Sequence, residues 1–96
     1  MPMYLQGKTI DMIITSKTPK LDLHGEKLLM VEALVNSFIN DNYLLKNDTV
    51  IIIHGKSTDI ITNEVYRVLK KNKKVFEFRR NNWNLGETIV SIINKK

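Results

Sequence analysis

A chain of 96 residues can form one domain with a modest core, and 43% hydrophobic with 26% charged residues is typical of a globular protein. The absence of cysteine excludes disulfides and thiol catalysis, and two histidines are too few for a dedicated metal cage, so we expect no cofactor; nothing in the sequence supports a divalent metal. No apolar run reaches the length of a membrane span and no signal peptide is recognisable, so we expect a cytoplasmic protein that does not contact a membrane.

The net charge of +5 is unevenly distributed along the chain. Residues 1–60 hold six Lys and seven Asp or Glu, hence −1, whereas residues 61–96 hold nine Lys or Arg and three Glu, hence +6. A basic half is typical of a protein that binds a polyanion such as RNA or DNA. The alternative interpretation is a solvated surface with no specific partner.

The first half of the chain predicts an N-terminal arm and linker over residues 1–19, followed by a domain over residues 20–96. Residues 20–24 read as a strand. Residues 28–45 read as a helix because apolar side chains recur on one helical face, at Leu28, Val31, Leu34, Val35, Phe38 and Leu45.

The second half predicts three more strands and one helix. Residues 49–54 form an unbroken apolar run, which is typical of a central, buried strand. Thr58 or Asp59 can cap a helix that continues to about residue 72, with its apolar side at Ile60, Ile61, Val65, Val68 and Leu69. Residues 75–80 and 87–93 read as strands joined by a loop, with Phe76 and Phe78 pointing inward.

The order β-α-β-α-β-β predicts an α/β fold, a two-layer sandwich with a four-stranded mixed sheet. Right-handed crossovers put both helices on one face, and a short loop makes the last two strands antiparallel. We expect the apolar side chains under the helices to be Leu21, Leu23, Ile51 and Ile53. The open face or its rim would then carry Asp22, His24, Ile52 and His54.

Two of the predicted strands end in His-Gly, at His24-Gly25 and His54-Gly55. Ligands bind beyond the carboxyl ends of strands in sheets of this type. His24 and His54 can transfer protons near neutral pH, and Asp22 can orient one of them. The alternative is that each histidine bonds only to local backbone and that Asp22 caps a turn. A metal site would have these three side chains as ligands, which is too few to prefer it.

Basic and aromatic residues supply candidate contacts to nucleic acid. Gly55, Lys56 and Ser57 precede a helix, where amides and a lysine favour a phosphate. Lys70, Lys71, Lys73 and Lys74 form a second basic stretch, which the alternative interpretation treats as a solvated helix end. Arg79 and Arg80 can bind phosphates, and Trp83 can stack on a base or instead pack against the rim of the sheet.

Over residues 20–93 the sequence resembles the Smr domain, a family named for small MutS-related proteins. Four motifs in order carry the resemblance: Leu21-Asp22-Leu23-His24-Gly25, Phe38-Ile39-Asn40-Asp41, Ile52-Ile53-His54-Gly55-Lys56 and Gly86-Glu87-Thr88-Ile89-Val90. It implies a fold like the C-terminal domain of translation initiation factor three. It also implies nucleic-acid binding; several relatives nick DNA or cleave RNA, some on collided ribosomes.

The resemblance implies that Asp22 and His24 carry activity and that His54, Gly55 and Lys56 take part in substrate binding or catalysis. Two positions depart from the family pattern. Ser57 stands where the second motif usually has another glycine, and Thr62 where an arginine is often found.

We therefore expect a small endonuclease that acts on RNA or DNA, with the ribosome as a candidate partner. His24 would be the general acid or base, Asp22 its orienter, and His54 a second proton carrier or a hydrogen-bond donor to phosphate. Gly25 would let the chain turn sharply and take part in nucleic-acid binding, while Lys56 and Arg79 would neutralise phosphate charge. The alternative is a non-catalytic module that binds ribosomal or structured nucleic acid.

Overall fold

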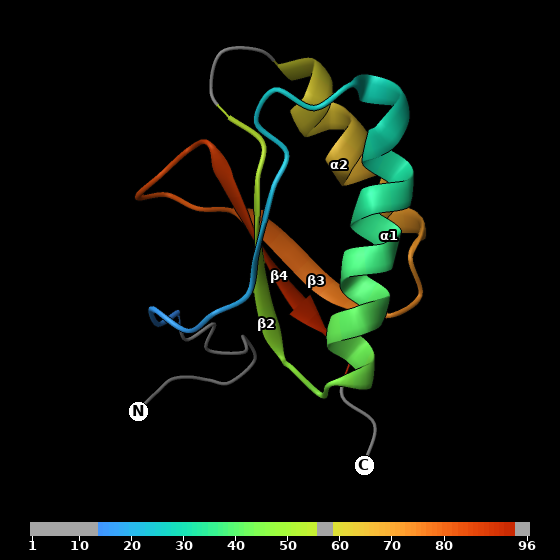
Figure 1. The fold of residues 1–96 in the computed structure, drawn as a ribbon. Coiled ribbons are helices and arrows are strands. Elements are labelled where there is room, and N and C mark those ends of the chain that lie inside the picture. Colours follow the sequence, from blue (N-terminus) through green and yellow to red (C-terminus); the bar gives the residue numbers. More distant parts are fainter. Residues whose placement is uncertain (1–13, 56–58, 94–96) are drawn as a thin grey trace.

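The computed structural model describes residues 14–55 and 59–93, which form two helices and four strands (Figure 1). The elements are β1 (Lys20–Asp22), α1 (Leu28–Leu44), β2 (Thr49–Ile53), α2 (Asp59–Lys71), β3 (Val75–Arg80) and β4 (Glu87–Ile92). Their order matches the predicted one, and the largest difference in a strand end is two residues, at the end of β1. No helix in the described part is long and apolar enough to cross a membrane.

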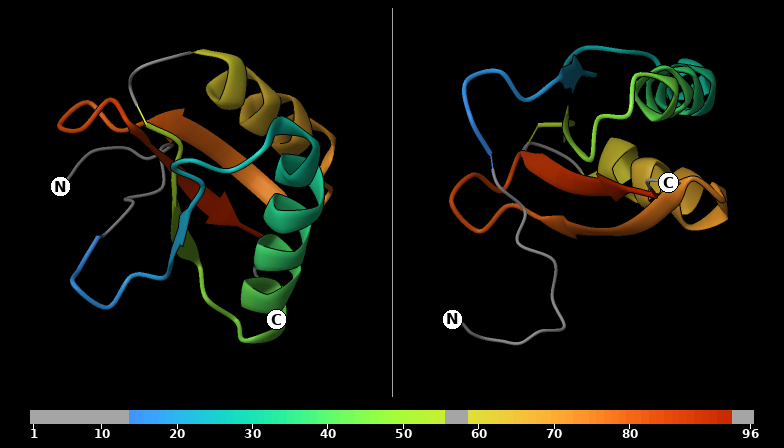
Figure 2. Two further views of the ribbon diagram at one scale, coloured as in Figure 1. Left: turned by 45° about the horizontal axis from the view of Figure 1, so that its top comes forward. Right: turned by 90° about the horizontal axis from the view of Figure 1, so that it is seen from below.

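The four strands form one mixed sheet in the order β1-β2-β4-β3. β1 runs parallel to β2, and β4 runs antiparallel to both β2 and β3. Figures 1 and 2 show α1 and α2 side by side on one face of this sheet. The predicted two-layer α/β sandwich is therefore confirmed.

Strand pairing gathers several chain segments at one end of the sheet. Ile53, at the end of β2, pairs with Glu87 at the start of β4. Arg80, at the end of β3, pairs with Thr88. The carboxyl ends of β1, β2 and β3 therefore lie at the same end of the sheet, together with the start of β4.

The hydrophobic core fills the space between the helices and the sheet. The helices contribute Val31, Val35 and Ile39 of α1 and Val65, Val68 and Leu69 of α2. The sheet contributes Val50 and Ile52 of β2 and Val90 and Ile92 of β4, and Leu23, which follows β1, completes the set. Burial of these side chains supplies the main force that holds the two layers together.

The prediction for the inward face of β2 was wrong. Leu21 pairs with Ile52, so these two side chains share the helix-facing side, whereas Ile51 and Ile53 point to the opposite face. Because residues 50–53 are all apolar, they show no alternation that could reveal which side faces the core. One consequence is that His54, two residues after Ile52, also points toward the helices.

Four smaller expectations about apolar side chains also failed. Ile39 fills an inward position of α1, whereas Leu28, in its first turn, and Leu45, after its end, are exposed. Ile60 is exposed in the first turn of α2. Phe76 is 58% exposed because the pairing of β3 with β4 is irregular between Val75 and Glu77, which interrupts the alternation of β3.

Candidate functional site

The first His-Gly pair lies in a tight turn that follows β1. Oδ1 of Asp22 accepts a hydrogen bond from the backbone N–H of His24 at 2.9 Å. The carbonyl of Leu23 accepts from the N–H of Glu26 at 2.9 Å, which closes a four-residue turn. Gly25 occupies the third position with φ 80°, the left-handed conformation that a type II turn requires and that glycine adopts without strain.

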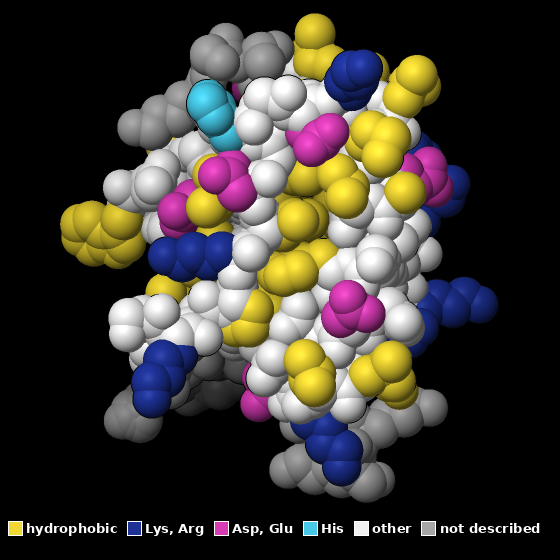
Figure 3. All heavy atoms as spheres, viewed as in Figure 1, with side chains coloured by type: hydrophobic (Ala, Val, Ile, Leu, Met, Phe, Trp, Pro, Cys, Tyr) yellow, Lys and Arg dark blue, Asp and Glu magenta, His cyan; other side chains and the backbone are white. Residues whose placement is uncertain are grey.

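This turn is anchored to the sheet and presents His24 to solvent. The N–H of Leu23 donates to the carbonyl of Ile53 at 2.7 Å, and the Leu23 side chain is buried in the core. Asp22 and His24 are both exposed. In the space-filling view of Figure 3, a histidine side chain lies at the molecular surface, and acidic side chains lie on the same face. Asp22 thus holds the backbone that carries His24, as its turn-capping interpretation predicts.

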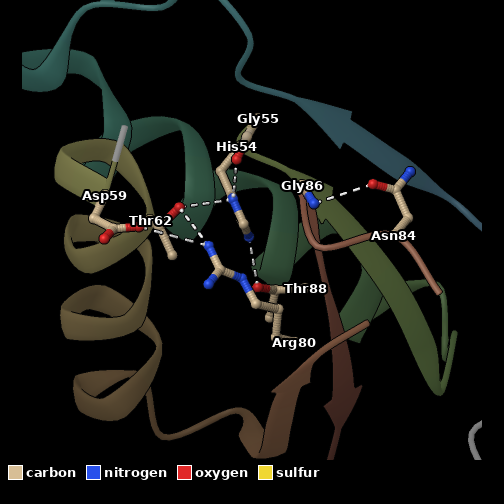
Figure 4. A network of polar contacts seen from close by, with 8 residues as sticks. All are labelled: His54, Gly55, Asp59, Thr62, Arg80, Asn84, Gly86 and Thr88. Carbon is tan, nitrogen blue, oxygen red and sulfur yellow. Dashed lines mark hydrogen bonds and ion pairs between the residues drawn. The ribbon is translucent and has the colours of Figure 1, made fainter. Parts of the chain in front are cut away.

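The second histidine has a different environment. His54 is only 4% exposed and lies between β2, α2 and β4 (Figure 4). Its Nε2 is 2.8 Å from Oγ1 of Thr88. Its Nδ1 is 2.8 Å from Oγ1 of Thr62 and 3.1 Å from the carbonyl oxygen of Gly55. Both ring nitrogens therefore have protein partners, and the imidazole ties the start of α2 to the sheet.

Burial lowers the pKa of His54 below its ordinary value of 6.5, because the protein interior disfavours the charged ring. The positive charge of Arg80 acts in the same direction. The hydrogen bond with the Gly55 carbonyl and the charges of Glu87 and Asp59 oppose the shift without reversing it. The ring is therefore neutral at pH 7, with one nitrogen donating and the other accepting a hydrogen bond.

Arg80 completes the network around His54. Its terminal nitrogen is 3.5 Å from Oγ1 of Thr62 and 3.8 Å from a carboxylate oxygen of Asp59 (Figure 4). Its Nε is buried and has no hydrogen-bond partner in the described part of the chain. Arg80 points to the helix side of the sheet, unlike Arg79, whose partner Ile89 lies on the opposite face.

Sequence reasoning missed Thr62 and Thr88, which hold the His54 ring. Both hydroxyl side chains are buried. Thr62 lies three residues before Val65 on the inward face of α2, and Thr88 lies two residues before Val90 on the inward face of β4. A threonine at an inward position is the signal that could have revealed them, since a buried hydroxyl needs a hydrogen-bond partner.

Gly86, which immediately precedes β4, binds the backbone of both residues of the second His-Gly pair. The carbonyl of Gly86 accepts hydrogen bonds from the N–H groups of His54, at 2.8 Å, and Gly55, at 3.0 Å. Gly55 has φ 86°, a left-handed conformation that glycine adopts without strain. A Cβ added at this position would meet no atom within 4 Å, so the backbone conformation, and not a lack of space, favours glycine here. The predicted phosphate contacts Lys56 and Ser57 lie outside the described residues.

The loop between β3 and β4 brings Trp83 to this end of the sheet. Its side chain is 98% exposed, so the interpretation in which the indole packs against the rim was wrong. Arg79 is also exposed. The turn places Arg79, Arg80 and Trp83 at the sheet end that holds Asp22 and His24.

The lysines after α2 lie at the other end of the sheet, because Val75 begins β3 opposite Ile92, the last residue of β4. Lys70, Lys71 and Lys73 are exposed, whereas the Nζ of Lys74 lies 5.3 Å from the centroid of the Tyr43 ring. Lys71, Lys73 and Lys74 help line a separate groove of about 450 Å³ between α1 and α2. The structure therefore does not bring these lysines together with His24.

No three histidine, aspartate or glutamate side chains gather as a metal site within residues 14–55 and 59–93. The buried ring of His54 bonds to threonines and to backbone, while Asp22 bonds to the backbone of His24. The three residues considered above as metal ligands thus do not form a coordinating cluster in this structure.

Comparisons with known proteins place this arrangement in a family. The family model of the Smr domain matches residues 21–95. The chain is 32% identical over 79 residues to endonuclease MutS2 of Halothermothrix orenii, which covers 82% of the chain. It is 38% identical over 76 residues to endonuclease MutS2 of Ligilactobacillus salivarius, which covers 76% of the chain. The matched part spans 10% of the length of each of these relatives.

Two solved structures share the fold. The Smr domain of Thermus thermophilus MutS2 superposes with a TM-score of 0.75 at 22% identity, covering 79% of this chain and 99% of that one. YdaL, a stand-alone small MutS-related protein from Escherichia coli, also gives 0.75, at 24% identity, covering 83% of this chain and 70% of that one. From the match over residues 21–95 and the relatives above 30% identity, the chain belongs to the Smr domain family.

Proposed function

We propose that this domain binds nucleic acid and cleaves a phosphodiester bond at the end of the sheet where β1 and β2 finish. The observation that carries the proposal is the exposed imidazole of His24 on a turn that Asp22, Gly25 and the β1–β2 pairing fix. The similarity to proteins named endonuclease MutS2 supports it. RNA and DNA are both candidate substrates, because both carry the phosphodiester that this site would attack.

In this proposal His24 is the general acid or base, because it is the histidine whose side chain reaches solvent. Asp22 is a positioning residue that acts through the backbone of His24. His54 is also a positioning residue, since both of its ring nitrogens are occupied and its lowered pKa keeps it neutral. It would hold Gly55 and the start of α2 where the substrate passes.

Charge would supply most of the binding energy. Arg79 is exposed at this end of the sheet, and Lys56 follows Gly55 in the sequence. Their positive charges would neutralise phosphates and release counterions, so binding should weaken as salt concentration rises. The surplus of +6 in residues 61–96 supports salt-dependent binding by the domain as a whole, although its four lysines at positions 70, 71, 73 and 74 lie at the other end of the sheet.

The second candidate function is a module that binds structured or ribosomal nucleic acid without cleaving it. The hydrogen bond that Asp22 accepts from the His24 backbone favours this alternative. Capping of the turn is by itself a sufficient structural reason for an aspartate at position 22, without any role in catalysis. Both functions predict that the protein binds nucleic acid, but only the nuclease predicts that it cleaves it.

The test is to incubate the purified protein with end-labelled single-stranded and duplex RNA and DNA, with and without a metal chelator. Product formation supports the nuclease, and the chelator arm shows whether a divalent metal is needed. Binding without product supports the non-catalytic module. Absence of binding to every substrate would exclude both functions.

A further inference from the structure

A pocket of about 410 Å³ opens beside the loop that joins β3 to β4. Ile89 is a buried residue of β4 on the sheet face opposite the helices, and Ile14 comes from the segment before β1. The rest of the lining comes from residues 79–83, which include two arginines, two asparagines and Trp83, and of the two arginines Arg79 is the exposed one. The pocket therefore combines apolar walls with hydrogen-bonding groups and one exposed positive charge.

The loop that presents the indole is held by its own hydrogen bonds. Oδ1 of Asn81 accepts from the N–H of Trp83 at 2.9 Å, and the N–H of Asn81 donates to the carbonyl of Glu87 at 2.9 Å. The N–H of Glu87 donates to the carbonyl of Asn84 at 3.0 Å. These hydrogen bonds hold the backbone of Trp83 in place, while its indole ring is almost wholly exposed. An exposed indole carried by an ordered turn offers a flat platform on which a base can stack.

The chemistry of the lining identifies the ligand class. A nucleobase offers a flat face that can stack on Trp83 and an edge that can bond to the amide of Asn82. The phosphate of the same nucleotide can pair with the exposed guanidinium of Arg79. Ile14 offers an apolar surface within the same pocket. A base inside a duplex cannot enter, because its faces are covered by its stacked neighbours and its edge is paired.

We propose that this pocket binds one unpaired nucleobase, so that the domain selects RNA or DNA with at least one unpaired nucleotide over fully paired duplex. The inference rests on the proposed nucleic-acid function and specifies its substrate class. It also gives Ile14, in the predicted N-terminal arm, a role in binding.

The pocket and His24 lie at the same end of the sheet but at different strands. Three strand spacings separate β3 from β1 in the order β1-β2-β4-β3, which amounts to about 14 Å at roughly 4.8 Å per spacing. A strand whose base is held by Trp83 can therefore pass the start of β4 and the carboxyl end of β2 and reach His24 within a few nucleotides. Stacking in the pocket would fix the position of the cleaved bond along the strand.

Trp83 is the only tryptophan in the chain, so its fluorescence reports on this pocket alone. The experiment titrates the full chain with a short single-stranded RNA, the same sequence as DNA, each as a blunt duplex, and a single strand whose central nucleotides are abasic. We expect quenching by both single strands, much weaker quenching by the duplexes, and little quenching by the abasic strand.

Variants then separate stacking from general binding. Trp83→Ala should weaken single-strand binding roughly 5- to 150-fold, the range measured for loss of one stacked base, and leave duplex binding unchanged. Trp83→Phe should restore part of the affinity, and Ile14→Ala should cause a smaller loss. Leu29→Ala is the matched control, because Leu29 is another large exposed side chain, 93% exposed, but lies on α1.

Equal affinity and equal quenching for single strand and duplex would overturn the inference, as would unchanged single-strand binding by Trp83→Ala. Nucleic-acid binding would stand in both cases, so the proposed function would survive. Quenching by RNA alone or by DNA alone would support the pocket and identify its sugar preference. Absence of binding to all probes would overturn the proposed function together with this inference.

Discussion

The carboxylate of Asp22 accepts a hydrogen bond from the backbone N–H of His24, with 2.9 Å between Oδ1 and the nitrogen. The acid is therefore part of the turn that presents the imidazole. An asparagine can make the same bond through its amide oxygen, whereas an alanine cannot. This difference separates a role in shaping the turn from a role that needs the negative charge.

We predict that Asp22→Asn keeps most of the cleavage rate and that Asp22→Ala loses about 10²-fold, the cost of misplacing a reacting group by about 1 Å. Single-turnover cleavage of a labelled oligonucleotide measures both rates. Thermal unfolding of each variant is the control for fold. Equal, severe losses in both variants would show instead that His24 depends on the charge of Asp22.

The environment of His54 predicts a pH dependence of stability. Burial lowers its pKa below 6.5 in the folded state, so the folded protein favours the neutral ring more than the unfolded chain does. That stabilisation is fully present above the unfolded value of 6.5 and is lost as the pH falls through the lower folded pKa.

Two measurements check this expectation for His54. The ring protons should titrate by NMR with a midpoint below 6.5. The free energy of unfolding in urea should decrease between about pH 7 and about pH 5, and His54→Gln should flatten that dependence. A ring that titrates at or above 6.5 would contradict the buried, neutral assignment.

The two basic regions predict different effects on salt-dependent binding. Arg79 is exposed at the end of the sheet that holds His24, whereas Lys71 is the last residue of α2 and lies near the opposite end of the sheet. If substrate follows the His24 end, Arg79→Ala should reduce the slope of log affinity against log salt by about 1, the effect of one lost phosphate contact.

Lys71→Ala is the matched control and should leave that slope unchanged. Both slopes come from the same titrations of labelled single strand between about 50 and about 200 mM salt. The reverse pattern would place the nucleic acid along the lysines after α2 and the groove between the helices, at a distance from the proposed catalytic turn.

Much of the fold could be predicted because its determinants are local. The periodicity of α1 and α2, the short connections and the right-handed crossover rule were enough for the element order and the two-layer architecture. The inward face of β2 could not be predicted, since its residues from Val50 to Ile53 are all apolar. The exposure of Phe76 depends on a pairing irregularity that only the partner strand reveals.

The candidate site was predicted in outline for the same reason. The two His-Gly pairs marked the correct strand ends, but the error in the face of β2 put His54 on the wrong side of the sheet. His54 instead bonds to Thr62 and Thr88, two residues distant in sequence whose hydroxyls gave no motif. The exposure of Trp83 required the conformation of the loop, because a tryptophan beside arginines is equally compatible with stacking and with packing.

The proposed cleavage mechanism requires that His24 transfers a proton to or from the reacting phosphodiester. The measurement is single-turnover cleavage of a labelled single strand by wild type, His24→Ala and Glu26→Ala. Glu26 is the matched control, because it is an exposed side chain in the same turn.

Removal of a general acid or base typically costs 10²–10⁴-fold in rate. We therefore predict a loss of about that size for His24→Ala, with binding nearly unchanged and with Glu26→Ala close to wild type. Cleavage by purified His24→Ala at the wild-type rate would contradict a catalytic role for His24.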